Sequence, residues 1–297
     1  MSNSKSVSRK PQSIKRSKQL GLVLRWLLAI VLVTFSIFTV LWILSAAINP
    51  VTDMANQQLI PKHADFSNFR ELTTTPVFPF FTWLKNSLNV SILSTLLTLS
   101  LTTMAAFAFS RFRFRGRQGL LKAMLLIQSF PNLLAIVALF TIIKQLGDVF
   151  PPLGLNTHAG LILVYSGGAM GMNIWLMKGY MDTIPRDIDE SAHVDGATDW
   201  QVFSKLILPL LRPILTVIAI LSFIGTYGEF IIARTLLTKR ELQTAMVGLQ
   251  IFPAGQYTQN WGVFAAGALI AALPIMIIYL ILQDQLGGGL TQGAVKG

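Results

Sequence analysis

The stretch "DESAHVDGATDWQVFSKLILP" (189–209) is polar and acidic in a chain that is otherwise mostly apolar. The whole chain of 297 residues contains 13 Asp and Glu side chains. Nearly half of them lie close together in and just before this stretch, namely Asp182, Asp187, Asp189, Glu190, Asp195 and Asp199. What such a concentration of acid does depends on where the chain runs relative to water.

Composition places the chain in a membrane. Hydrophobic residues make up 53% of it, charged residues make up 12%, and the mean hydropathy is +0.59, values typical of a chain whose solvent is mostly lipid. The net charge of +11 would suggest nucleic acid as a partner of a soluble protein, but Lys and Arg beside apolar spans act as a topological signal. We expect no nucleic-acid partner. The absence of cysteine excludes disulfides and cysteine-ligated metals.

Apolar stretches long enough to cross a bilayer predict an all-α membrane protein. A helix needs about 20 apolar residues to cross a hydrocarbon layer of about 30 Å. Six stretches meet this requirement: Trp26–Ile48, Asn86–Ser110, Leu120–Ile143, Ala159–Met177, Pro213–Ala233 and Val263–Leu282. We therefore expect a basic tail at 1–25, a six-span domain at 26–283 that contains a cytoplasmic coupling loop at 182–209, and a second tail at 284–297.

Basic residues predict the orientation of these spans. With six spans, the N-terminal tail, "RFRFRGRQGLLK" (111–122), 178–205 and Lys296 lie on one side and together hold sixteen Lys and Arg residues, against seven on the other side. Positive residues near span ends resist translocation. Both termini and the acidic stretch are therefore expected in the cytoplasm, and the protein in the cytoplasmic (inner) membrane as a multi-pass protein.

Start and stop signals in 183–200 predict two short helices joined at a glycine. Pro185 suits a first helical turn, and the acidic residues after it suit a helix N-terminus. Gly196 can end that helix, and Thr198 with Gln201 has the spacing of a capping box that begins a second one. The first helix carries a narrow face of mostly small side chains, formed by Ile188, Ser191, Ala192 and Asp195.

These residues resemble a known motif. "DESAHVDGA" followed by "LILP" is similar to the Glu-Ala-Ala loop by which permease subunits of ATP-binding-cassette importers dock onto their ATPase. The matching positions are Glu190, Ser191, Ala192, Asp195, Gly196 and Pro209, with Ser191 where alanine is usual. The segments "FPNLLAIVALF" (130–140), "GLNTHAGLILVYSGG" (154–168) and "GLTQGAVKG" (289–297) resemble the smaller permease of maltose/maltodextrin importers.

The resemblance implies a type I importer permease fold and a non-catalytic role in the import of maltose, maltodextrin or a related oligosaccharide. It implies a heterodimer with a second permease subunit, two ATPase subunits that bind ATP and magnesium, and an extracytoplasmic sugar-binding protein. This chain would carry no cofactor itself. ATPase docking would involve Ile188, Glu190, Ser191, Ala192, Asp195, Gly196 and Pro209, and the C-terminal tail would reach the ATPase through Gly293, Val295 and Lys296.

Other classes of protein lack support in the sequence. The phosphate-binding pattern Gly-x-x-x-x-Gly-Lys-[Ser/Thr] does not occur, nor do His-Glu-x-x-His and Gly-x-Ser-x-Gly. A secondary transporter usually has ionisable residues near the bilayer midplane, and only Glu229 is a candidate acid. Glu229 is interpreted either as part of the translocation path or its outer gate, or as a carboxylate that reaches the interface or pairs with a neighbouring helix.

Two further segments each have two interpretations. In the outer loop, "LQIFPAGQYTQNWG" (249–262) mixes aromatic and amide side chains. The resemblance implies that this loop meets the binding protein, through Gln250, Gln256 and Tyr257, whereas composition alone fits an interfacial aromatic belt. The tail "LGGGLTQGAVKG" (286–297) would be flexible on composition, whereas the resemblance implies contact with the ATPase.

Overall fold

The structure is a computed structural model that describes residues 12–53, 55–75, 78–129, 132–254 and 259–291. Throughout these ranges the chain forms helices and loops without a strand, which confirms the all-α prediction. Five helices pack on one another as the main body of the fold: α1 (Gln12–Ile48), α3 (Phe80–Arg111), α6 (His158–Met181), α10 (Arg212–Tyr227) and α14 (Trp261–Thr291).

The other helices and turns lie between these five along the chain. They are α2 (Ser67–Thr74), α4 (Arg117–Gln128), α5 (Asn132–Val149), the 3₁₀ turn η1 (Pro151–Leu153), α7 (Asp187–Val194), α8 (Asp199–Gln201), the π-helical segment η2 (Val202–Ile207), α9 (Leu208–Leu210), α11 (Ile231–Leu236), the 3₁₀ turn η3 (Arg240–Leu242), α12 (Ala245–Leu249) and α13 (Ile251–Ala254).

Four of the predicted spans lie inside single long helices. In the described part of the chain, the helices that are long and apolar enough to cross a membrane run over Gly21–Ile48, Phe80–Arg111, His158–Met181 and Trp261–Gln283. A fifth candidate is a bent pair, in which Asp199–Leu210 and α10 meet at an angle of 76°.

The other two predicted spans differ from the structure. The stretch Leu120–Ile143 is divided between α4 and α5 rather than forming one helix, and Pro131, which has no N–H to donate inside a helix, lies in the sequence between them. The stretch Pro213–Ala233 is also interrupted. Helix α10 ends at Tyr227 with Gly228 as its C-cap, and the chain resumes as α11.

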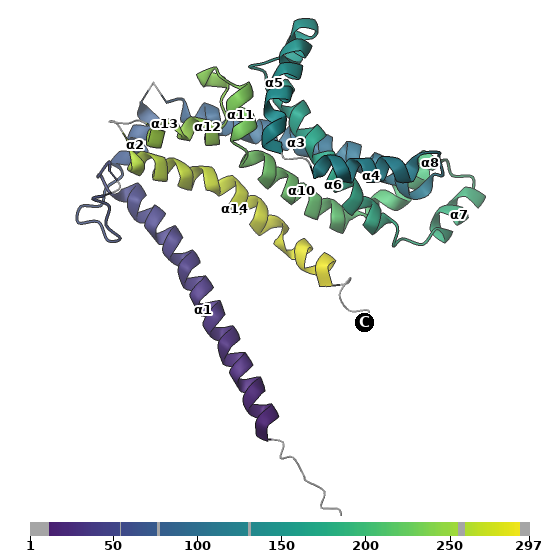
Figure 1. The fold of residues 1–297 in the computed structure, drawn as a ribbon, viewed down its shortest axis with the longest axis horizontal. Helices are drawn as coiled ribbons and strands as arrows, with labels where there is room; N and C mark the ends of the chain where they lie inside the picture. Colours follow the sequence, from purple (N-terminus) through teal and green to yellow (C-terminus); the bar gives the residue numbers. More distant parts are fainter. Residues whose placement is uncertain (1–11, 54, 76–77, 130–131, 255–258, 292–297) are drawn as a thin grey trace, which may run out of the picture.

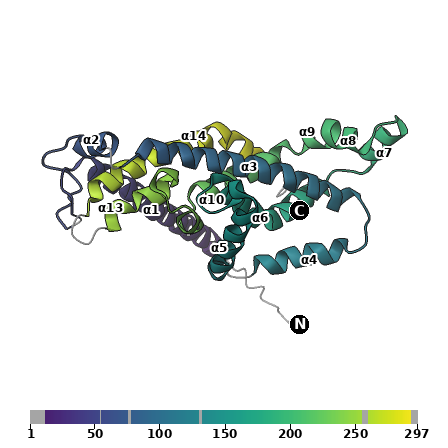
Figure 2. The same cartoon turned by 90° about the horizontal axis from the view of Figure 1, so that it is seen from above.

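Helix α3 lies at the centre of the fold, against α6 and α10 (Figures 1 and 2). One face of α3 is a buried row of small hydroxyl side chains, Ser87, Ser91, Ser94, Thr95, Thr98, Thr102 and Thr103. Small residues allow helix backbones to approach closely inside a membrane. This row explains how three apolar helices pack tightly without large interlocking side chains along their middle.

The connections separate toward two ends of the molecule. Helices α2, α12 and α13 lie together at one end, and α7 and α8 lie at the opposite end, beyond the cytoplasmic end of α3 expected from the sequence (Figures 1 and 2). At the first end, Trp83 is fully buried and its Nε1 donates to the carbonyl oxygen of Arg240 at 2.7 Å. Its ring also lies against Gly248, where an added Cβ would come within 2.2 Å of it.

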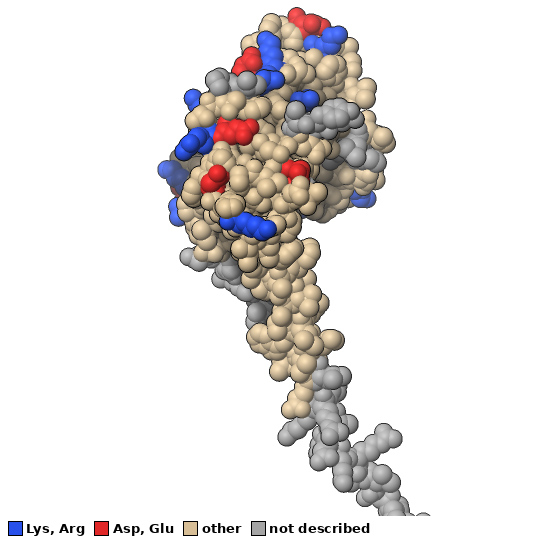
Figure 3. Space-filling view, turned by 90° about the vertical axis from the view of Figure 1, so that its left-hand side faces the viewer, with Lys and Arg blue, Asp and Glu red and all other residues tan. Residues whose placement is uncertain are grey.

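Helix α1 contacts the rest of the chain mainly through its last turn. Ala46 and Ala47 pack on Ala265 and Ala266 of α14, and α1 then diverges from α14 (Figure 1). None of the most apolar part of α1 is buried. Viewed from the end of the molecule where α2, α12 and α13 lie, the coloured part of α1 is mostly tan, while acidic and basic residues are scattered over the body above it (Figure 3).

Candidate functional site

The acidic stretch folds as predicted at its first helix and glycine. Helix α7 spans Asp187–Val194, with acidic residues in its first turn, where the helix N-terminus favours negative charge. Gly196 follows with φ +83°. The Gly196 amide donates to the carbonyl of His193 at 3.0 Å, and the Ala197 amide donates to that of Ala192 at 2.9 Å. These two bonds form a Schellman motif, which needs a residue in the left-handed conformation and so favours glycine.

The second helix begins at the predicted capping box. The Gln201 amide donates to Thr198 Oγ1 at 3.3 Å, and the Thr198 amide donates to Gln201 Oε1 at 2.8 Å. The α-helical pattern then widens into the π-helical segment η2 before α9. Pro209 lies in α9 and cannot donate an α-helical bond to Lys205, so it interrupts the regular pattern at this point. The chain finally bends into α10.

The residues predicted to dock a partner differ in exposure. Six of them are exposed, namely Ile188, Glu190, Ser191, Asp195, Gly196 and Pro209. The side chain of Ile188 is 36% exposed. Ala192 is only half-buried and packs inward, with Ala197, against an apolar cluster that includes Met181, Phe203 and Ile207. Helix α7 therefore has one side turned to solvent and one side held on the body of the protein.

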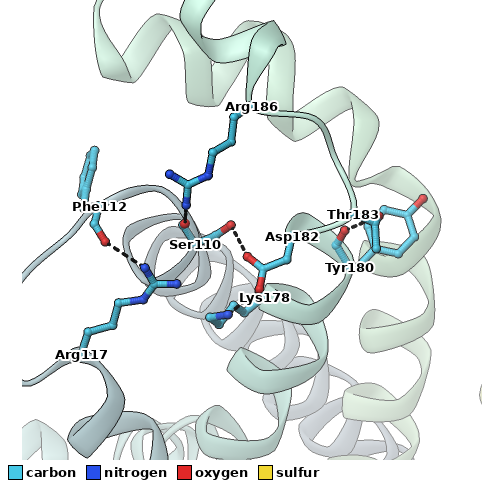
Figure 4. A network of polar contacts seen from close by, with 8 residues as sticks. All are labelled: Ser110, Phe112, Arg117, Lys178, Tyr180, Asp182, Thr183 and Arg186. Carbon is cyan, nitrogen blue, oxygen red and sulfur yellow. Dashed lines mark hydrogen bonds and ion pairs between the residues drawn. The ribbon is translucent and has the colours of Figure 1, made fainter.

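Polar contacts attach the start of this segment to the end of α3 (Figure 4). Arg186 Nη2 donates to the carbonyl oxygen of Ser110 at 2.8 Å, and Ser110 Oγ donates to Asp182 Oδ1 at 2.7 Å. Asp182 also forms an ion pair with Lys178, one turn earlier in α6. The C-terminal ends of α3 and α6 and the residues just before α7 are thus joined in one network.

A buried ion pair extends these contacts into α7 itself. Arg111 is the last residue of α3, and its Nε lies 2.6 Å from Asp189 Oδ2. The two side chains are only 7% and 12% exposed. Arg111 Nη2 also donates to the carbonyl oxygen of Ile184 at 3.2 Å. No sequence pattern reveals this pair, because Arg111 lies in a basic run that fits a topological signal and Asp189 fits a helix N-terminus.

Burial and neighbouring charges act in opposite directions on the two acids. Desolvation has the largest influence on Asp189 and raises the pKa of its carboxyl above the ordinary value, against the attraction of Arg111. Desolvation also opposes ionisation of Asp182, but hydrogen bonds from Lys178 and Ser110, with the charge of Lys178, outweigh it and lower the pKa of that carboxyl. Ionisation is therefore disfavoured at Asp189 and favoured at Asp182, relative to an ordinary aspartate.

A cavity of about 200 Å³ lies beside the ion pair. It is open to solvent and has charged side chains of both signs around an aromatic wall. Its lining residues are Phe107, Arg111, Phe112, Arg186, Asp189, Glu190, His193, Asp199 and Val202. The exposed Glu190 is thus at the edge of a hollow that could receive a side chain from another protein.

Glu229 pairs with a neighbouring helix, which was one of its two predicted interpretations. Its Oε1 accepts the amide of Ile232 at 2.8 Å. Its Oε2 accepts the amide of Ala233 at 2.9 Å and the hydroxyl of Tyr165 at 2.6 Å. Both carboxylate oxygens are therefore engaged in holding the N-terminus of α11 to α6.

The outer loop is described only in part. Gln250 is exposed between α12 and α13, whereas Gln256 and Tyr257 lie outside the described residues, as do Gly293, Val295 and Lys296 of the tail. A cavity of about 410 Å³ lies at this end, lined by Thr52, Glu71, Phe78, Ile251, Phe252, Gln259 and Asn260. The rings of Phe78 and Phe252 lie with their centroids 4.7 Å apart and their planes tilted by 57°, and Glu71 lines the same cavity.

Comparison with known proteins gives a family for this arrangement. Residues 98–291 match the model of the family described as "Binding-protein-dependent transport system inner membrane component". That range includes the C-terminal part of α3, all of α6 and α10, and the whole of the acidic stretch.

Individual relatives agree with the family match. The chain is 48% identical over 226 residues to the maltose/maltodextrin transport system permease protein MalG of Vibrio vulnificus, covering 75% of each chain. It is 38% identical to the protein of the same name from Photorhabdus laumondii, over 95% of this chain and 98% of the relative. It is also 37% identical to the galactooligosaccharides transport system permease protein GanQ of Bacillus subtilis, over 96% and 99%.

Solved structures share the fold. A chain of a bacterial ABC transporter involved in the import of the acidic polysaccharide alginate superimposes with a TM-score of 0.76 at 22% identity, over 91% of this chain and 97% of that one. A second structure, of the alginate transporter in complex with an alginate pentasaccharide-bound periplasmic protein, gives a TM-score of 0.63 at 21% identity, over 91% and 94%.

Proposed function

Because this chain belongs to the family of inner membrane components of binding-protein-dependent transport systems, we propose that it is one permease subunit of an ATP-driven importer for maltose, maltodextrin or a related oligosaccharide. It crosses the inner membrane six times with both termini in the cytoplasm. A second permease subunit completes the pathway. Two ATPase subunits bind ATP and magnesium, so this chain is not itself catalytic. A sugar-binding protein delivers the sugar from outside.

The single observation that carries this proposal is the geometry of the acidic stretch. A helix with a solvent-exposed acidic side, α7, is held at one end of the membrane helices by polar contacts to α3 and by packing of Ala192 on a cluster that includes Met181 of α6. Such a helix can receive a push from a soluble partner and pass it to the spans. Closure of an ATPase dimer upon ATP binding would then switch the spans from inward-facing to outward-facing around the sugar.

The contacts of Glu229 and the sequence patterns also bear on the two alternative functions, a secondary transporter and an intramembrane enzyme. A secondary transporter needs an ionisable residue free to bind the coupling ion, but both oxygens of Glu229 accept hydrogen bonds from α11 and Tyr165. An intramembrane enzyme would need a catalytic constellation that the sequence patterns do not supply. Transport driven by a separate ATPase agrees better with these contacts.

The substrate class rests on the relatives. The relatives named for maltose or maltodextrin and for galactooligosaccharides are both matched over most of their length. We propose a maltose-type oligosaccharide, because identity reaches 48% with a maltose/maltodextrin permease. Uptake by the assembled importer should be measured over maltodextrins, galactooligosaccharides and alginate oligosaccharides. Uptake of galactooligosaccharides alone would contradict the choice of maltodextrin and leave the importer role intact.

Charge reversal of Glu190 tests ATPase docking. If Glu190 enters a groove of the ATPase, Glu190→Lys should break a buried charged contact worth about 3–5 kcal/mol, whereas an exposed ion pair contributes at most ~1 kcal/mol. At ~1.4 kcal/mol per tenfold, docking affinity should fall at least about a hundredfold. The measurement is co-purification of the ATPase subunits of the importer with this chain, with sugar uptake followed in parallel.

A matched control separates docking from charge alone. Asp148→Lys makes the same change of charge on an exposed acid of α5, outside the docking segment, and should leave co-purification and uptake at the parental level. Membrane abundance of each variant shows whether the chain folds. Retention of the ATPase by Glu190→Lys at the parental level would mean that the acidic stretch is a solvated loop and that the docking proposal is wrong.

A further inference from the structure

The two partners of the buried ion pair come from different helix ends. Arg111 is in the last turn of α3, where a positive charge is favoured by the helix dipole. Asp189 is in the first turn of α7, where a negative charge is favoured. Their contact at 2.6 Å therefore joins two helix ends of complementary polarity. The pair is the most direct polar link between the docking helix and a membrane span in the described residues.

Each charge depends on the other. Arg111 Nε and Asp189 Oδ1 are buried and make no hydrogen bond in the described structure, although the two charged groups touch. Removal of one member would leave the other charged and shielded from water, which is far less favourable than replacing both together. The pair thus favours the arrangement in which α7 lies against the end of α3, and disfavours any arrangement that separates them.

The bend at Gly196, which follows α7, is also held by several contacts. The Schellman bonds at Gly196 hold the end of α7, and Ala192 and Ala197 pack into the same apolar cluster as Ala106 and Phe107 of α3. His193 Nδ1 lies 2.9 Å from the carbonyl oxygen of Ala197 across the bend. Rotation at Gly196 alone would break these contacts as well as the ion pair.

We propose that Arg111 and Asp189 form a positioning pair that makes α7 move as one body with the cytoplasmic end of α3, so that a push on α7 tilts α3 rather than opening the bend at Gly196. The inference rests on the proposed function in one respect, namely that a partner pushes α7. The mechanical linkage itself is a property of this chain alone. Neither residue contacts the sugar or ATP, and both act through the position of α7.

The linkage can be measured without any partner. The chain has no cysteine, so spin labels can be placed uniquely at Leu101→Cys on α3 and Val194→Cys at the end of α7, which are 40% and 88% exposed. In the full-length chain in lipid, the distance distribution between the labels should be narrow. It should broaden in Asp189→Asn and in Arg111→Gln, and stay narrow in Asp189→Glu, which keeps the charge.

Two further variants complete the test. Asp187→Asn removes an exposed acid from the same helix and should leave the distribution narrow. The double variant Arg111→Gln with Asp189→Asn strands no charge, so it should accumulate in the membrane even where the single variants do not. It should nevertheless show the broad distribution. A narrow distribution in this double variant would overturn the proposal.

The assembled importer provides the functional readout. With the pair removed, the ATPase should still co-purify, because Glu190 is unchanged, but sugar imported per ATP hydrolysed should fall about tenfold, a factor that corresponds to roughly 1.4 kcal/mol of lost coupling. Parental coupling together with a broad label distribution would also overturn the role of the pair in transport. Failure of the parental chain to bind any ATPase would refute the proposed function. The distance measurement between the spin labels would still test whether the ion pair holds α7 to α3.

Discussion

At the scale of single residues, Gly196 shows how a local signal in the sequence determines the shape of the docking segment. Its φ of +83° belongs to the left-handed region, and an added Cβ would meet no other atom within 4 Å. The requirement for glycine therefore arises from the backbone and not from lack of space. The same two properties hold at Gly116, between α3 and α4.

Substitutions at these two glycines should separate backbone strain from docking. Gly196→Ala and Gly116→Ala should each lower the free energy of unfolding by about 1–2 kcal/mol, the cost of the left-handed conformation for a residue with a Cβ. Gly196→Asn should lower it less, because Asn adopts this conformation more readily. Thermal melts in detergent give the stabilities. Transport should fall in Gly196→Ala alone, and equal transport by all three variants would contradict a role for this bend.

Signals of this kind explain which site residues could be predicted. Gly196, Thr198 and Gln201 act on neighbours within a few positions, so their types and spacing were sufficient. The pairing of Arg111 with Asp189 joins the ends of two helices far apart in the chain, and neither position has a local pattern that names its partner. The one available hint was that Asp189 shares a face of α7 with the small Ala192, which is the side that turns inward.

At the scale of helices, α11 depends on Glu229. This helix has only six residues, too few to be stable by itself, and no capping side chain at Phe230. Glu229 accepts the amides of Ile232 and Ala233 instead. An acid inside the predicted span Pro213–Ala233 is thus used to begin a new helix, which explains why that span is interrupted.

Glu229→Gln tests this role against that of a gate. The amide group of Gln offers one acceptor oxygen, so a backbone or hydroxyl donor would face an NH₂ group, and stability should fall by about 1–3 kcal/mol. Tyr165→Phe removes one hydrogen bond and leaves both backbone amides capped, so its effect should be smaller, about 0.5–1.5 kcal/mol. Melting temperatures give the comparison. Uptake lost in Glu229→Gln without any loss of stability would instead support the gate.

The two interrupted spans show what hydropathy alone does not predict about a membrane helix. A window of apolar residues predicts that a stretch avoids water, but it does not report where the helix is broken. The stretch 120–143 contains Pro131, and a proline in a helical pattern was available as a signal for a break. A break somewhere in this stretch could therefore be predicted from the sequence. The bend of 76° before α10 could not, because it depends on how α9 packs against the rest of the protein.

At the scale of the whole molecule, the loops separate into two groups. The segment 111–117 lies with 182–209 at one end, joined by the contacts of Arg111 and Arg186. The segments around Asn68 and Gln243 lie at the other end, where Asn68 binds the carbonyl oxygen of Asn49 and Asn86 binds that of Gln243. Composition predicts that the chain lies in a membrane, and the distribution of basic residues predicts the side on which each loop lies. Only contacts between distant residues show which loops lie at the same end of the molecule.

Reporter fusions test both the grouping and its orientation. A reporter that is active only in the cytoplasm should work when inserted after Gly116 or Gly196 and fail after Ile60 or Lys239, because basic residues that flank spans are retained in the cytoplasm. A second reporter that is active only outside should give the opposite pattern. Each insertion site is exposed, and membrane abundance serves as the control for folding.

The pattern of reporter activity tests the fold and the orientation separately. Different results at Gly116 and Gly196 would contradict the arrangement of the helices. A consistent but inverted pattern would preserve the fold and place α7 outside the cell, where no ATPase could dock on it.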